Sequence, residues 1–269
     1  MKPELLPDGQ PIPKIGFGMW KIGGGTTADP AQDAPSLRAL HTALETGYTH
    51  FDTAEMYAAG HSEELLARAI RESATPREAL FITTKVTPAH LGYNDLKRAC
   101  ENSLRRLQTE YIDLYLIHWP GRAPLEESFR ALNELHAAGK IRHIGVSNFR
   151  LPMLKQSRQL CHSPIATNQV PYSLTDRSYV ENGVLDYCVE NNILLTAYSP
   201  VDEGRLRVGH ALKNVAQKYN ATPYQIALAW LIQQPGVITI PMSMNPLHIT
   251  ENFQAGEIVL APEDFEELG

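Results

Sequence analysis

Three successive segments decide the fold class of this 269-residue chain: LFITTKV (80–86), NDLKRACENSLRRLQ (94–108) and IDLYLIHW (112–119). The first and third are short and rich in β-branched and aromatic residues, which is typical of strands. Both are apolar on both sides, as expected of strands in a parallel sheet that helices cover. The middle segment has the amphipathic pattern of a helix. Strand, helix and strand in this order predict one βαβ unit.

The same alternation continues along the whole chain. Helical patterns recur at SEELLARAIRES (62–73), LEESFRALNELHAAGK (125–140) and TPYQIALAWLIQQ (222–234), and we expect Ser62 and Pro223 to start the first and last of these. Six further strands are expected at GFGMW (16–20), HFDTA (50–54), HIGVSN (143–148), ATNQV (166–170), ILLTAYS (193–199) and VITIP (237–241). Eight strand–helix units predict an α/β fold of the (β/α)8 TIM-barrel type.

The N-terminal segment LLPDGQPIPKIG (5–16) has Asp8-Gly9 between two short arms, and this pattern predicts a β-hairpin before the barrel. No linker or shift in composition divides the chain. We therefore expect a single domain over residues 1–269.

A doubly wound dinucleotide-binding sheet is the alternative architecture. Its GxGxxG fingerprint should follow the first strand, but the sequence there reads KIGGGTTADP (21–30). We expect Gly23, Gly24 and Gly25 to form a flexible loop rather than a phosphate cradle. The barrel is therefore the favoured fold.

The composition narrows the class of protein. A formal net charge of −6 and the lack of any lysine- or arginine-rich run argue against a nucleic-acid partner. No apolar run is long enough to span a membrane, and the N-terminus does not resemble a signal peptide. Cys100, Cys161 and Cys188 form no CxxC motif and fit small buried residues in a reducing compartment. We expect a cytoplasmic protein.

Four polar residues follow strands two, three and four of the expected barrel: Asp52, Tyr57, Lys85 and His118. Each has a plain structural explanation, such as a turn cap, a core edge, a solvated lysine or a buried histidine. In a TIM barrel, however, the C-terminal ends of the strands meet at the rim that carries the active site. We therefore expect these four residues to lie together.

Such a group suits proton delivery to a carbonyl oxygen. A tyrosine is a weak acid, with a reference pKa of about 10, and a nearby ammonium favours its phenolate. We expect Lys85 to lower the pKa of Tyr57, and Asp52 to keep Lys85 charged. His118 would bond the substrate oxygen or share the proton. The group lacks a hydride source, so a nicotinamide cofactor is required.

The chain resembles the aldo-keto reductases over nearly its whole length. The resemblance rests on seven motifs in the family's order, which are DTAEMY (52–57), FITTK (81–85), IDLYLIHWP (112–120), IGVSNF (144–149), NQV (168–170), AYSP (197–200) and IPMS…ITEN (240–252). It implies an NAD(P)H-dependent reductase of aldehydes and ketones in which Tyr57 is the general acid. Asp52, Lys85 and His118 take the supporting roles.

The resemblance also implies a cofactor site. Tyr198 would stack on the nicotinamide, and Ser147, Asn148 and Gln169 would hold its carboxamide, although strand-end hydrogen bonding is another explanation for the last two. The remaining cofactor residues implied are Lys21, Asp52, Ser199, Pro200, Val201, Ile240, Met242, Ser243, His248, Glu251 and Asn252.

The chain departs from the family at two of these positions. Met242 and His248 stand where relatives use a lysine and an arginine for the 2′-phosphate of NADPH. NADP(H) remains the family default, but these replacements predict relaxed or preferred use of NAD(H), unless Lys21 or another cation restores the charge. Asp202 and Glu203 are two acids beside the expected pyrophosphate site, so we expect them to face solvent.

Specificity residues are less well defined. The expected substrate walls are Trp20, Met56, Tyr57, His118 and Trp119, with Thr87 where relatives often have a tryptophan. Trp20 and Trp119 have core packing as the alternative. Short loops and a chain that stops at EDFEELG predict an open pocket for a small carbonyl substrate, in a monomer.

Two other functions fit the sequence less well. A metal-dependent hydrolase lacks HxH and HExxH motifs. A nicotinamide-binding sensor subunit would retain the four polar residues but should carry an added interaction segment, which is not evident.

Overall fold

The computed structural model describes residues 2–269 and contains an eight-stranded parallel sheet. The strands follow one another in space in chain order, so each pairs with its sequence neighbour. They are β3 (Phe17–Gly18), β4 (His50–Asp52), β5 (Phe81–Val86), β6 (Ile112–Ile117), β7 (Ile141–Ser147), β8 (Ile165–Pro171), β9 (Leu194–Tyr198) and β10 (Val237–Thr239). All eight predicted strands are confirmed.

The sheet closes on itself between its last and first strands. Ile15, just before β3, forms a parallel bridge with Thr239 of β10. Gly16 N donates to Thr239 O at 2.8 Å, and Thr239 N donates to Lys14 O at 2.8 Å. A closed parallel sheet of eight strands is a TIM barrel, as expected.

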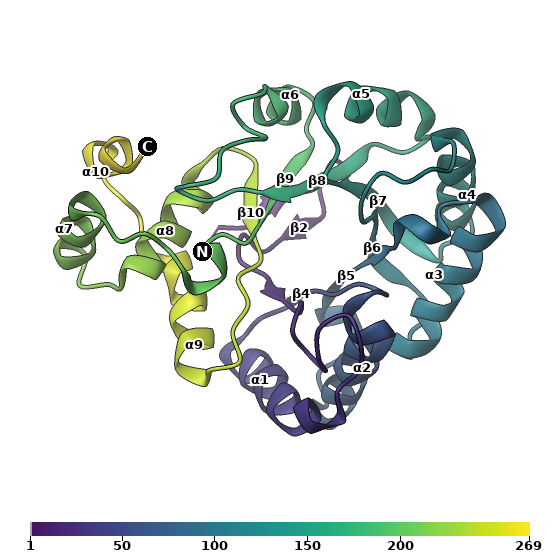
Figure 1. The fold of residues 1–269 in the computed structure, drawn as a ribbon, viewed down its shortest axis with the longest axis horizontal. Coiled ribbons are helices and arrows are strands. Elements are labelled where there is room, and N and C mark those ends of the chain that lie inside the picture. The colour runs from purple at the N-terminus through teal and green to yellow at the C-terminus, as the bar shows by residue number, and fades with distance from the viewer. Residues whose placement is uncertain (1) are drawn as a thin grey trace.

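Helices surround the barrel in a ring (Figure 1). They are α1 (Asp33–Thr46), α2 (His61–Ser73), α3 (Tyr93–Leu107), α4 (Leu125–Ala137), α5 (Leu151–Leu160), α6 (Val184–Glu190), α7 (His210–Lys218), α8 (Pro223–Gln233), α9 (Pro246–Gln254) and α10 (Pro262–Leu268). Each connection between consecutive barrel strands includes a helix on the outer face of the sheet. The strands are therefore buried on both sides.

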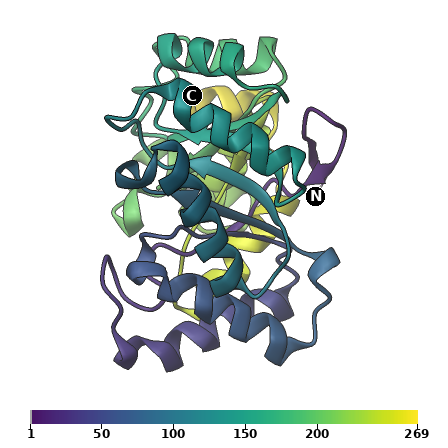
Figure 2. The same cartoon turned by 90° about the vertical axis from the view of Figure 1, so that its right-hand side faces the viewer.

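The predicted hairpin precedes the barrel as β1 (Glu4–Leu5) and β2 (Pro11–Ile12), and it projects beside the N-terminus in Figure 2. Gly9 takes a φ of 88° at its turn. Leu6 and Ile12 pack with Phe81 and Leu114, near the N-terminal ends of their strands. The hairpin therefore covers the barrel floor, opposite the rim where the strands end.

Of the two helix starts predicted from the sequence, one is confirmed and one is not. Thr222 caps α8 in a capping box with Gln225, and Pro223 is its first residue, as predicted. Ser62 does not cap α2, which begins at His61. Its buried hydroxyl instead accepts a hydrogen bond from Thr53 Oγ1 at 3.1 Å, so it ties α2 to the end of β4.

Residues 2–269 include no helix that is both long and apolar enough to cross a membrane.

Asp113, a buried residue of β6, ties three strands together on the floor side. Its carboxylate accepts from Ile82 N of β5 at 2.9 Å and from Arg77 Nη2 at 2.6 Å. Arg142 Nη1 of β7 lies 3.3 Å from its other oxygen. Removal of the carboxylate would leave a backbone donor and a half-buried guanidinium without their partner.

We therefore expect Asp113→Ala to lower the free energy of unfolding by on the order of 3 kcal/mol, because one partner of a buried ion pair is lost. Urea unfolding followed by circular dichroism measures this change. Asp95→Ala is the matched control, since Asp95 pairs with Arg98 on the exposed face of α3 and should cost less than about 1 kcal/mol. Equal losses in the two variants would contradict this role for Asp113.

Candidate active site

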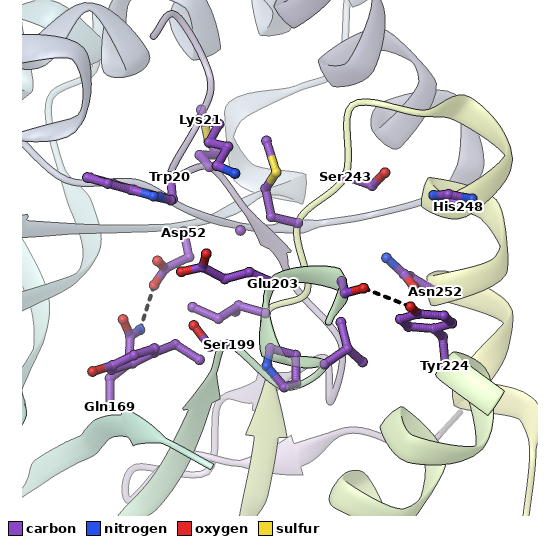
Figure 3. A pocket seen from close by; sticks show the side chains of 18 of the residues that line it. Trp20, Lys21, Asp52, Gln169, Ser199, Glu203, Tyr224, Ser243, His248 and Asn252 are labelled. Atoms are coloured by element: carbon purple, nitrogen blue, oxygen red, sulfur yellow. Dashed lines mark hydrogen bonds between the residues drawn. The ribbon is translucent and has the colours of Figure 1, made fainter. Parts of the chain in front are cut away.

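A cavity of about 890 Å³ opens at the rim formed by the C-terminal ends of the strands. Figure 3 shows Asp52 and Gln169 at one end of it, and His248, Asn252 and Tyr224 at the other. Most of the predicted site residues line it, namely Trp20, Lys21, Asp52, Tyr57, His118, Trp119, Ser147, Gln169, Tyr198, Ser199, Pro200, Val201, Ile240, Met242, Ser243, His248, Glu251 and Asn252. Its size and elongated lining suit a dinucleotide plus a small second molecule.

A buried ion pair lies at the first end of the cavity. Lys85 Nζ donates to Asp52 Oδ1 at 2.5 Å and to Thr53 O at 2.7 Å. Neither side chain of the pair is more than 1% exposed. Tyr57 OH lies 3.4 Å from the same ammonium, and Lys85 itself does not line the cavity, whereas Asp52 and Tyr57 do. The sequence prediction that these three residues meet is matched by the structure.

The second oxygen of Asp52 is held from the opposite side. Gln169 Nε2 of β8 donates to Asp52 Oδ2 at 2.8 Å (Figure 3). Ser147 Oγ of β7 in turn donates to Gln169 O at 2.8 Å. Four strands thus fix the carboxylate and its lysine in one orientation.

Aromatic rings surround the phenol of Tyr57. Trp20 contacts it edge-on, with ring centroids 5.1 Å apart, and His118 does so at 5.6 Å. Trp119 stacks on His118 at 3.9 Å and is 37% exposed. The ring of Tyr57 therefore lies in an aromatic recess, with its hydroxyl toward Lys85 and with the partly exposed Trp119 nearby.

Tyr57 opens a short, irregular helix, η2 (Tyr57–Gly60). The next residues, Ala58, Ala59 and Gly60, have φ values of 50°, 54° and 94°. A left-handed backbone costs about 1–2 kcal/mol for each residue other than glycine. Such a conformation persists only where its surroundings enforce it.

Gly23, Gly24 and Gly25, here called the glycine segment, help to hold this left-handed turn in place. Ala58 N donates to Gly25 O at 2.8 Å, and Asp29 N donates to Gly23 O at 2.8 Å. Gly24 has a φ of 133°, and a Cβ there would lie 2.3 Å from Thr27 O. The expected flexible loop is thus a hydrogen-bonded turn against the tyrosine segment.

Burial and charge set the protonation of the site. Burial lowers the pKa of His118 to about 2, and Lys85 adds to this effect. His118 Nδ1 is buried and has no hydrogen-bond partner among the described residues. The imidazole is therefore neutral at physiological pH, and it acts as a hydrogen-bonding group rather than as a cation.

The expectation that Lys85 lowers the pKa of Tyr57 is wrong as a net effect. Burial raises this pKa and Asp52 adds to the rise, while Lys85 opposes it without reversing it. Burial also disfavours the charge on Lys85, but Asp52 and Tyr57 outweigh it and raise the pKa of the ammonium. Tyr57 is thus a protonated phenol beside a permanent cation.

Three predicted site residues lie outside the wall that residues 2–269 form around the cavity. Lys85 and Asn148 are buried, and Met56, an expected substrate wall, does not line the cavity. Asn148 has a φ of 62° and donates to His118 O at 3.1 Å. Its Oδ1 accepts from Tyr198 OH at 2.8 Å, so it joins the two strand ends that face the cavity.

One residue at the end of the cavity opposite Asp52 was not predicted from the sequence. Tyr224 lines the cavity beside Asn252, and its hydroxyl donates to Gly204 O at 2.9 Å (Figure 3). The capping signal at Thr222 was visible in the sequence and puts the start of α8 at the rim. This capping signal could have indicated that Tyr224, the second residue of α8, lies near the cavity.

Glu203, in the loop after β9, is exposed as expected, with a side chain that is 52% exposed and pairs with Arg205, but it also lines the cavity (Figure 3). Its backbone is left-handed, with a φ of 55°, which the sequence did not suggest. Asp202 accepts from Ser173 Oγ at 3.0 Å and from Thr175 Oγ1 at 2.5 Å. It therefore anchors the loop to the segment after β8.

The sequence pattern of the Aldo/keto reductase family matches residues 14–269. The chain belongs to this family. It is an NAD(P)H-dependent oxidoreductase that reduces aldehydes and ketones to alcohols, as the motifs implied. The matched region covers every strand of the barrel and the whole cavity wall.

Similar proteins include reductases of small dicarbonyl compounds. The chain is 37% identical to glyoxal reductase of Bacillus subtilis, over 98% of this chain and 90% of that protein. It is 38% identical to methylglyoxal reductase YeaE of Escherichia coli, over 96% of this chain and 90% of that protein.

Solved structures of aldo-keto reductases have the same fold as this chain. The thermostable aldo-keto reductase Tm1743, crystallised with the inhibitor epalrestat, superimposes with a TM-score of 0.96 at 44% identity, covering 100% of this chain and 98% of the other. An aldo/keto reductase from Klebsiella pneumoniae in complex with NADP and acetate has a TM-score of 0.89 at 39% identity, covering 100% and 94%.

The protonation states predict the pH dependence of the reaction. Tyr57 and Lys85 have raised pKa values and His118 has a pKa of about 2, so none of these three side chains titrates near neutrality. We expect kcat/KM for aldehyde reduction to be flat from about pH 5.5 to 8 and to fall only at alkaline pH, as Tyr57 loses its proton. Initial rates in a constant-ionic-strength buffer series measure it. A falling acid limb centred near pH 6.5 would show that His118 titrates normally.

Proposed function

We propose that this aldo-keto reductase reduces small 2-oxoaldehydes such as methylglyoxal and glyoxal, with Tyr57 as the general acid. The observation that carries the proposal is the phenol of Tyr57, 3.4 Å from the buried Lys85 ammonium and inside the aromatic recess. The names of the similar reductases from Bacillus subtilis and Escherichia coli support the substrate class. The aromatic recess, with Trp20 and Trp119 in the cavity wall, suits a small carbonyl compound.

Four side chains of this protein would have separate roles in the reaction. The phenol of Tyr57 donates a hydrogen bond to the carbonyl oxygen and then its proton, as negative charge grows there. Lys85 stabilises the phenolate that remains, and Asp52 keeps Lys85 charged and in place. Neutral His118 orients the oxygen from the side. When bound, a reduced nicotinamide would supply the hydride that the carbonyl carbon accepts.

We propose that the cofactor occupies the long axis of the cavity. The exposed side of the Tyr198 ring suits a nicotinamide face, and Ser147 and Gln169 offer polar groups for its carboxamide. Asn148 would act from behind, through its bond to Tyr198 OH. Ser243, Glu251 and Asn252 would hold the adenosine, and Tyr224 would form its outer wall.

Cofactor preference is a finer proposal. Structures of Klebsiella pneumoniae relatives contain NADP or NADPH. In this chain, Met242 and His248 line the cavity where a 2′-phosphate would need cations, and Glu203 adds a carboxylate nearby. We propose that NADPH is used with a reduced advantage over NADH, because neither the Met242 thioether nor the His248 imidazole offers the paired, permanently charged donors of an arginine.

We further propose that residues 1–269 act as one domain and as a cytoplasmic monomer. Strands from Phe17 to Thr239 share one sheet, which supports the first statement. Cys100, Cys161 and Cys188 are free thiols, which suits a reducing compartment. Sedimentation of the purified protein decides the oligomeric state.

Tyr57→Phe tests the general acid. The change removes only the hydroxyl, so methylglyoxal reduction should fall by at least about a hundredfold, while the Kd for NADPH stays within about twofold. Oxidation of NADPH at 340 nm and quenching of tryptophan emission measure the two quantities. Tyr93→Phe, which removes a phenol from the exposed face of α3, is the matched control. A Tyr57→Phe enzyme that keeps most of its turnover refutes the assignment.

Met242→Lys with His248→Arg tests whether positions 242 and 248 determine the binding of the 2′-phosphate of NADPH. The double change should shift the ratio of NADPH to NADH affinity by about tenfold or more, on the order of 1.4 kcal/mol, because two charge-assisted contacts are added. Leu247→Lys adds a cation on the exposed face of the same helix and serves as the control for non-specific attraction. An unchanged ratio in the double variant would mean that this segment does not contact the 2′-phosphate.

A further inference from the structure

The left-handed turn after Tyr57 is held by more than the glycine segment. Gly60 packs directly against the side chain of Arg106, near the end of α3. A Cβ at Gly60 would lie 2.6 Å from Arg106 Nε and 2.7 Å from Arg106 Cδ. With a φ of 94°, Gly60 is also in a conformation that other residues rarely adopt. The backbone can pass this closely only because the residue has no side chain.

Arg106 is itself fixed by a buried carboxylate. Its Nε donates to Glu63 Oε2 at 2.6 Å, and its Nη2 donates to Ser103 Oγ at 3.2 Å. The side chain of Glu63 is fully buried in the first turn of α2, three residues after Gly60. A buried carboxylate needs such a partner, since its loss of hydration is otherwise uncompensated.

The other oxygen of Glu63 connects this pair to the catalytic strand. Thr84 Oγ1 donates to Glu63 Oε1 at 2.6 Å. Thr84 is the neighbour of Lys85 in β5, and its side chain points to the helices, because successive side chains of a strand point to opposite faces. One set of contacts thus joins the strand that carries the lysine to the turn that carries the tyrosine.

We propose that Arg106, held by Glu63, is a positioning residue that sets the place of the Tyr57 hydroxyl relative to Lys85. Neither residue lines the cavity that residues 2–269 form. Their influence on the reaction therefore passes through the backbone of Ala58, Ala59 and Gly60. The proposal rests on the role of Tyr57 as general acid.

The arrangement predicts a specific kinetic signature. Weakening the contact should let the strained turn relax and move the phenol away from the ammonium. Small displacements of a reacting group lower the rate steeply, whereas cofactor contacts made by β7, β8 and β9 stay in place. The loss should therefore fall on kcat, with the cofactor Kd unchanged.

Arg106→Lys is the primary test, because it keeps a charge beside Glu63 and so keeps the fold. A lysine lacks the planar group that covers Gly60 and bonds Glu63 and Ser103 together. We expect kcat for methylglyoxal to fall by about tenfold, with the KM for the aldehyde and the Kd for NADPH within about twofold. Arg98→Lys, on the exposed part of the same helix, should leave all three quantities unchanged.

Gly60→Ala disturbs the same contact by adding a side chain to the turn instead of changing the arginine. It should reproduce the loss in kcat, and combining it with Arg106→Lys should cost less than the product of the two single effects, since both act through one contact. Glu63→Gln with Arg106→Met replaces the ion pair by neutral groups and should give the same loss in kcat if the first variant proves unstable. Thermal unfolding is measured for every variant, so that rates are compared per folded molecule.

The outcomes separate the two proposals. If Tyr57→Phe is inactive but the Arg106 variants keep their kcat per folded molecule, the positioning role is wrong and the general acid stands. A loss of NADPH affinity that parallels the loss of kcat would also overturn it, because that pattern reports general loosening of the barrel. If Tyr57→Phe itself stays active, the proposed function fails, whatever Arg106 does.

Discussion

The buried pair of Lys85 and Asp52 is the interaction on which the rest of the site depends. Each charge is removed from water, so each is tolerated only because the other lies beside it, and loss of one partner of such a pair costs about 3–5 kcal/mol. Thr53 O and Gln169 complete the hydrogen bonds around them. Tyr57 and His118 are then arranged around a cation that cannot move. The strand ends of the barrel make this possible, because they deliver β4, β5 and β8 to one rim.

Much of this was predictable from the sequence, for identifiable reasons. The alternation of strand and helix patterns repeats eight times, so the fold does not depend on any single segment. Asp52, Lys85 and His118 come at or directly after strand ends, and a parallel barrel brings such positions together whatever the details of its loops. The hairpin was marked by Asp8-Gly9, a pair that adopts this turn with little strain.

The failures share a physical cause, which is that they depend on loop geometry or on burial. The place of Glu203 in the cavity wall follows from a left-handed backbone that nothing in its local sequence requires. The net pKa shift of Tyr57 follows from how deeply the ring is buried, and Lys85 alone predicts the opposite sign. The contact of Arg106 with Glu63 joins residues 43 positions apart in sequence, beyond the reach of local patterns.

The positions of the three tryptophans give the molecule a built-in optical readout. Trp20 and Trp119 flank the reacting phenol and line the cavity, whereas Trp230 is only 2% exposed and packs against Phe265 on the outer side of the barrel. Light emitted by the first two indoles responds to whatever occupies the cavity. The surroundings of Trp230 change when the neighbouring helices come apart. The intrinsic fluorescence of the protein therefore responds both to occupancy of the cavity and to unfolding, without any added dye.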